Sequence, residues 1–310
     1  MNVRPVILSA PLLTSRAAVP HLPASSVFET ALYLRALPAV AAGAGLVLWL
    51  LHSVWLSRLS PKPPTLAASP FQKALWGALG ALGLVAFSVL IPAATGSYSK
   101  AAAGWAPFLQ PPGAPANPGA ARVLAVFLVQ SLSEELIFRG ILMGGLGAVL
   151  LLLLSTVTVH ALPGEPTDSP RLGAARRRTW LLAGLLANLA QSAAFTWVHG
   201  ANPGMTPLAS VNIGLAGFVL GWLFWSQGAL WGAWTYHFVW NFALAAAGLP
   251  VSGVLASPAL LPLGISGSRP GPISGGAFGP EASVACTVGL LGVLAALLAL
   301  SRRRRAETGG

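Results

Sequence analysis

The sequence is 310 residues long, and its composition is that of a membrane protein. Hydrophobic residues make up 55% of the chain and charged residues only 8%, whereas a soluble domain carries about 25% charged residues. A soluble fold of this size cannot bury so much apolar surface, and disordered chains are poor in apolar residues and rich in charge. The composition excludes both classes and indicates a polytopic integral membrane protein.

The net charge of +11 comes from 18 Lys and Arg residues against 7 Asp and Glu residues. Many of the basic residues stand beside apolar stretches, as in the arginine runs at 176–178 and 302–305. Basic residues at the ends of membrane spans mark the cytoplasmic side and contact anionic lipid headgroups. We therefore expect anionic lipids at these flanks and no nucleic-acid binding.

Apolar stretches of about 20 residues predict the membrane-spanning helices. The stretch 122–160 is about twice as long as one span needs, so we expect it to break near Gly140 or the glycines at 144–147 and to give two helices. A polar loop with the first arginine run is expected at 162–178. The spans are expected at 36–57, 73–94, the two halves of 122–160, 179–199, 207–226, 229–248 and 283–300.

These stretches predict an all-α bundle with about eight transmembrane helices, or seven if 122–160 forms a single tilted helix. Eight spans place both termini in the cytoplasm and collect more Lys and Arg on that side than seven do, which favours eight. The chain then divides into a Pro-rich arm, two N-terminal helices with a loop, a catalytic core, and a C-terminal part with a Gly/Pro loop, the last helix and a basic cytoplasmic tail. The bounds of these parts are 1–35, 36–119, 120–248 and 249–310.

Three ionisable residues lie close together within the stretch 122–160, where each such group costs about 2.5–3.5 kcal/mol to insert. Glu135 and Arg139 are four positions apart and share a helix face, so they can form an ion pair. Glu134 is rotated by about 100° from Glu135 and lacks such a partner. A buried, unpaired carboxylate suits a general acid or base. The alternative is a charged helix end that reaches the membrane surface.

Two further spans each carry a histidine. His199 ends one of them, and His237 shares a helix face with Asn241, four positions later. A lone histidine within a span is more often a buried residue than a ligand or a catalytic group. Two of them beside a glutamate pair indicate a site, because a carboxylate base, imidazoles and a carboxamide can activate water and stabilise an oxyanion.

Absent motifs exclude other intramembrane protease chemistries. Neither histidine belongs to an HExxH pattern, no GxSxG serine motif occurs, and Asp168 is the only aspartate, so a two-aspartate mechanism is impossible. Glu/His chemistry remains. Because Glu134, His199 and His237 are also residue types that bind zinc, a zinc-dependent and a metal-free mechanism both stay open.

Three motifs on separate apolar helices resemble those of a known family. They are Glu134-Glu135-Leu-Ile-Phe-Arg139, Phe195-Thr-Trp-Val-His199 and His237-Phe-Val-Trp-Asn241. In this order they are similar to the motifs of the CPBP (CAAX protease and bacteriocin-processing, Abi) intramembrane proteases, which are related to the type II CAAX prenyl endopeptidase. The resemblance covers about residues 120–248.

The resemblance implies roles for the site residues. Glu134 and His199 would position and activate the attacking water, and His237 and Asn241 would stabilise the oxyanion. The residues that would support this site are Glu135, Arg139 and Phe195. The protein would then be a multi-pass endopeptidase of the bacterial cytoplasmic (inner) membrane that cleaves a peptide or membrane-protein substrate, which could carry a lipid.

Two other functions remain open from the sequence. A proton-coupled transporter could use Glu134 and His199 to relay protons, and a scaffold without catalysis could bind a partner within the bilayer. If the Glu and His side chains converge on one cavity, the protease is favoured. If they line a path through the membrane, the transporter is favoured.

Overall fold

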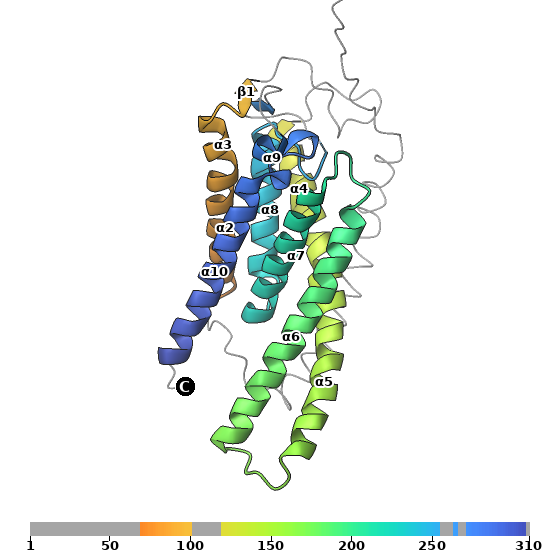
Figure 1. Cartoon of the computed structure of the whole chain (residues 1–310), viewed down its shortest axis with the longest axis vertical. Helices are drawn as coiled ribbons and strands as arrows, with labels where there is room; N and C mark the ends of the chain where they lie inside the picture. Colours follow the sequence, from red (N-terminus) through yellow and green to blue (C-terminus); the bar gives the residue numbers. More distant parts are fainter. Residues whose placement is uncertain (1–68, 101–118, 255–262, 266–270, 308–310) are drawn as a thin grey trace, which may run out of the picture.

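The computed structural model describes residues 69–100, 119–254, 263–265 and 271–307. In this part of the chain, six long helical units run side by side along the long axis of the molecule (Figure 1). The expected arm at 1–35 and the expected span at 36–57 lie outside the described residues.

The helical units follow one another in alternating directions (Figure 1). Two of them contain π-helical turns, which continue the α-helix on either side. The units are α2 (Pro70–Val85) with η2 (Ala86–Leu90) and α3 (Ile91–Ala94); α4 (Gly119–Glu135) with η3 (Leu136–Met143) and α5 (Gly144–Ala161); α6 (Pro170–His199); α7 (Pro207–Gln227); α8 (Trp231–Ala246); and α10 (Val284–Glu307).

Four helices among the described residues are long and apolar enough to cross a membrane. The described residues therefore form a membrane helix bundle, while the expected number of eight spans is not confirmed. The four are Pro70–Ala94, Val123–Ala161, Pro170–His199 and Pro207–Gln227, and Val284–Leu300 is a shorter apolar helix.

The predicted break at Gly140 or at the glycines 144–147 is wrong. Val123–Ala161 is one helix of 39 residues, and its hydrogen-bonding pattern changes only in η3, where π-helical turns replace α-helical ones. Such turns are frequent at functional sites. Gly147 does not end the helix but lets another one approach, because a Cβ atom there would lie 2.6 Å from the ring of Trp225 in α7.

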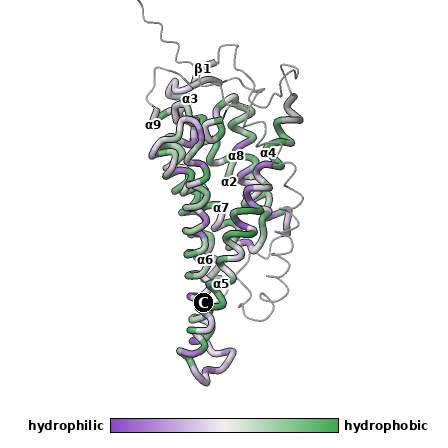
Figure 2. Tube along the Cα trace, turned by 90° about the vertical axis from the view of Figure 1, so that its right-hand side faces the viewer, coloured by the Kyte–Doolittle hydropathy of each residue, from purple (hydrophilic) through white to green (hydrophobic). Residues whose placement is uncertain are grey.

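The arginine run 176–178, expected in a loop, lies within α6. This helix begins at Pro170, and the hydroxyl of Ser169 before it accepts a hydrogen bond from the backbone N–H of Leu172 at 3.1 Å. Ser before Pro is a favoured helix start, since the side chain satisfies a free N–H and the fixed φ of Pro suits the first turn. α5 and α6 thus form a hairpin that extends beyond the bundle (Figure 1), with hydrophilic residues at its tip (Figure 2).

Buried amides join α6 to α7. Asn188 donates to the carbonyl of Phe218 at 2.9 Å, and Gln191 donates to the carbonyl of Gly217 at 2.9 Å. Both amide side chains are fully buried. The close approach depends on Gly221, because a Cβ atom there would collide with the side chain of Asn188. These contacts fix α6, and with it the end of α6 that carries His199.

The described parts of the segment between α8 and α10 fold against one end of the bundle. Gly253 and Gly279 hold positive φ angles of 83° and 97°, and a Cβ atom on either would collide with the backbone of Pro203 or Pro250. Only glycine allows this approach. The short elements here are α9 (Gly271–Ser274), η4 (Gly276–Phe278), η5 (Pro280–Ala282) and the strand β2 (Leu263–Ile265), which pairs antiparallel with β1 (Tyr98–Lys100).

Candidate active site

The ion pair expected from the spacing of Glu135 and Arg139 is present where α4 passes into η3. Arg139 Nη1 donates to Glu135 Oε1 at 2.8 Å, and both side chains are fully buried. Arg139 Nη2 donates to the carbonyl of Gly217 at 3.2 Å, and the guanidinium carbon lies 4.6 Å from the ring centre of Phe195. Arg139 thus connects its own helix to α6 and α7.

His237 lies between the two glutamates. Its Nδ1 atom is 2.8 Å from Glu135 Oε1, and its Nε2 atom is 3.8 Å from Glu134 Oε2. Each ring nitrogen therefore faces a carboxylate, and both contacts favour the ring that carries a proton on each nitrogen. Glu135 thus contacts His237 as well as Arg139, and this contact fixes the orientation of the His237 ring.

The two oxygens of Glu134 differ in their surroundings. Oε1 accepts a hydrogen bond from Gln130 Nε2, whereas Oε2 is buried and has no hydrogen-bond partner among the described residues. Gln130 in turn accepts a hydrogen bond from Asn241 Nδ2 at 3.1 Å. The sequence analysis missed Gln130, although it lies four positions before Glu134 and shares its helix face.

His199 presents one free nitrogen. Its Nδ1 atom is 2.7 Å from the carbonyl oxygen of Phe195, and because a carbonyl can only accept, Nδ1 carries the proton and Nε2 remains available. The ring centre of Phe195 lies 4.4 Å from that of His199 and 6.1 Å from that of His237. Phe195 is therefore in contact with both histidines as well as with Arg139.

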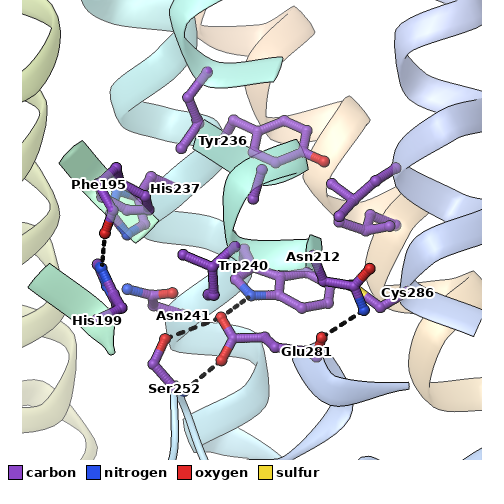
Figure 3. Close-up of a pocket in the computed structure, with 15 residues that line it drawn as sticks. Phe195, His199, Asn212, Tyr236, His237, Trp240, Asn241, Ser252, Glu281 and Cys286 are labelled. Atoms are coloured by element: carbon purple, nitrogen blue, oxygen red, sulfur yellow. Dashed lines mark hydrogen bonds between the residues drawn. The ribbon is translucent and has the colours of Figure 1, made fainter. Parts of the chain in front are cut away.

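A cavity brings His199, His237 and Asn241 together, as Figure 3 shows. About 30 Å³ of it is open to the centres of water-sized molecules, which is room for about two waters. Glu134 does not line this cavity. It contacts the lining residue His237, whose Nε2 atom is 3.8 Å from Glu134 Oε2. The apolar part of the wall comes from several helices and consists of Leu84, Ile213, Ala216, Leu220 and Leu290.

Glu281 is a cavity residue that the sequence analysis missed. It lies in η5 and is 6% exposed. Trp240 Nε1 donates to its Oε1 atom at 3.0 Å, Ser252 Oγ donates to the same atom at 3.2 Å, and the backbone N–H of Ser252 donates to Oε2. The only sequence signal is that one of the seven acidic residues lies two positions before the last expected span.

The possible zinc ligands Glu134, His199 and His237 do not form a metal site as they are arranged. In the part of the chain that the structure describes, no group of three or more His, Cys, Asp or Glu side chains is placed to hold a metal ion.

Residues 116–243 match the family model described as type II CAAX prenyl endopeptidase Rce1-like. This range contains all three motifs, from Glu134 to Asn241, and the match confirms the family that they suggested; Glu281 lies outside it. No curated protein and no solved structure matches the chain. Residues 116–243 are thus similar to the Rce1-like family, which supports an intramembrane protease of the CAAX type at the level of the family.

Proposed function

We propose that this protein is an intramembrane endopeptidase that hydrolyses a peptide bond with a water molecule activated by Glu134 and His199. The observation that carries the proposal is that His199 of α6 and His237 and Asn241 of α8 line one cavity in an apolar bundle (Figure 3). Glu134 of α4 lies next to this group, with its Oε2 atom 3.8 Å from His237 Nε2. Polar groups inside a membrane protein need such a reason, because each is costly to bury. The family acts on peptides or prenylated proteins, so the substrate class is a peptide or a lipidated membrane protein.

Glu134 and His199 are suited to activate the water. Glu134 Oε2 is buried and without a hydrogen bond, so its lone pairs are free to accept a proton. His199 Nε2 has a free lone pair that can hold the same water. The water oxygen attacks the carbonyl carbon while its proton passes to Glu134, and such a positioned base contributes about 10²–10⁴-fold to the rate.

His237 and Asn241 are suited to stabilise the oxyanion. With Glu135 at Nδ1, the protonated ring of His237 offers an N–H at Nε2. Asn241 uses one of its two amide hydrogens for Gln130 and has the other available. One such donor lowers the transition-state energy by about 2.7–4 kcal/mol. Glu135 then holds its histidine as the third residue of a catalytic triad does.

The location follows from the same proposal. The protein would span the cytoplasmic membrane of a bacterium, with anionic lipids bound at the arginine runs 176–178 and 302–305. The clusters lie in the N-terminal part of α6 and at the C-terminal end of α10, which are on the same side of the bundle (Figure 1). Neither the transporter nor the scaffold is favoured by the family match.

The test is cleavage of a quenched peptide with a prenylated C-terminal cysteine motif by the purified protein in lipid vesicles. Glu134→Gln keeps the volume of the side chain but cannot take up the proton, so we expect at least a 100-fold loss of kcat with an unchanged melting temperature. The matched control is Glu165→Gln, in the turn between α5 and α6, which should cleave like the wild type. Full activity of Glu134→Gln would refute the assignment.

A further inference from the structure

Glu281 stands on the cavity wall as a carboxylate that the Rce1-like match does not include. It comes from η5, whereas the match ends at residue 243. Figure 3 shows its side chain on the same cavity as His199 and His237, with Asn241 between it and His199. Because Glu134 does not line the cavity, Glu281 is the carboxylate that directly faces any group placed there.

The fold holds this residue in a defined position. Asn212 donates to the backbone carbonyls of Glu281 and Ser283 at 2.7 and 2.9 Å, and Thr287 donates to Asn212 Oδ1 at 2.7 Å. The backbone N–H of Ser252, which donates to the carboxylate, belongs to the only non-glycine residue with a positive φ in the described part of the chain, 48°. Such a conformation persists only when its surroundings enforce it.

The charge of Glu281 is not balanced by a basic residue. Among the described residues, Arg139 pairs with Glu135 and His237 pairs with both Glu134 and Glu135, and no ion pair includes Glu281. Burial raises the pKa of its carboxyl group, against the opposing effect of the hydrogen bonds from Trp240 and Ser252. The other titratable residues that line the same cavity are His199 of α6, Tyr236 and His237 of α8, and Cys286 of α10.

The two carboxylate oxygens leave room for one proton. Oε1 accepts two hydrogen bonds, from Trp240 and from the Ser252 hydroxyl, whereas Oε2 accepts one, from the Ser252 backbone. A proton on Oε2 therefore displaces no second donor.

We infer that Glu281 is a catalytic general acid, which protonates the leaving amine of the cleaved peptide bond; this inference rests on the proposed function. Water forms the new C–O bond and gives its proton to Glu134. The C–N bond breaks, and its electron pair takes the proton of Glu281. Glu134 then returns its proton through the cavity water to Glu281, so one water is consumed and one acid and one amine are released. Two carboxyl groups in different surroundings can act as the base and the acid of one reaction.

The test uses two probes that differ in their leaving group. One is the quenched prenylated peptide, whose amine needs a proton, and the other is the same acyl segment as a p-nitrophenyl ester, whose phenolate leaves without one. Glu281→Gln keeps the acceptor for Trp240 and the Ser252 hydroxyl but has no acidic proton. We expect it to lose at least 100-fold in kcat on the peptide and to keep its activity on the ester, while Glu134→Gln loses both.

A purely structural role would reduce both activities of Glu281→Gln in equal proportion, and that result, like an unchanged peptide activity, would overturn the inference. If the wild type cleaves neither probe, the proposed function fails, and the inference about Glu281 fails with it. The control Glu165→Gln should retain both activities.

A second variant decides the matter if Glu281→Gln does not fold. Since the acid must be protonated, peptide cleavage falls as the pH rises through the pKa of Glu281. The hydrogen bond from Trp240 lowers this pKa, so Trp240→Phe should raise it and move the alkaline limb of the pH profile for the peptide to higher pH. The ester profile should not show that shift, and an unmoved peptide limb would overturn the inference.

Discussion

The buried ion pair of Glu135 and Arg139 predicts that replacing Glu135 lowers the free energy of unfolding more than replacing Arg139 does. Glu135→Gln leaves the fully buried guanidinium with the carbonyl of Gly217 at 3.2 Å and the ring of Phe195 at 4.6 Å. Breaking a buried pair from one side costs about 3–5 kcal/mol, because the other charge stays uncompensated. We expect Glu135→Gln to lower the free energy of unfolding by that amount.

Arg139→Met should cost less. Glu135 keeps a charged partner, because His237 Nδ1 lies 2.8 Å from the same oxygen. The loss is then close to that of one hydrogen bond to a charged group, about 2 kcal/mol. In the double variant no charge is left stranded, so its cost should fall short of the summed single costs by about 2–3 kcal/mol.

Cys286 supplies the assay. It is the only cysteine of the chain and is 2% exposed, so a maleimide dye reacts with it only when the bundle opens. Denaturant titration in detergent, followed by the rate of dye labelling, gives the free energy of unfolding for each variant. Glu165→Gln serves as the control without effect. Equal costs for the two single variants, or additive costs in the double variant, would refute the reasoning.

Two further predictions concern packing and metal. Gly221→Ala should destabilise the protein by about 1–3 kcal/mol in the same labelling assay, because the new Cβ atom collides with Asn188. Gly145→Ala is the control and should cost no stability, because no atom lies within 4 Å of the new Cβ atom. Equal effects of the two substitutions would contradict the packing argument. Purified active protein should hold no stoichiometric zinc and should keep its activity in the presence of a chelator. A zinc content that rises and falls with the activity in metal analysis would refute the metal-free mechanism.

The sequence alone determined whatever depends on composition and on neighbours along one helix. The apolar stretches predicted the membrane bundle, and 207–226 and 229–248 lie within two residues of α7 and α8 at each end. The pair of Glu135 and Arg139 also followed, because four residues make about one turn whatever the helix packs against. The ends of helices were less certain, since the arginine run at 176–178 indicated a loop but lies inside α6.

Only the tertiary structure decided which helices meet and how closely. Glu135 and His237 are 102 positions apart, and no spacing predicts that their side chains touch. Gly147 is compatible with a helix break or with close helix packing, and the neighbouring Trp225 selects the second. Glu281 was one acid among glycines and prolines, and its place on the cavity comes from Asn212, Trp240 and Ser252 on other segments. Local spacing fixes the face of a helix, whereas long-range packing fixes what that face contacts.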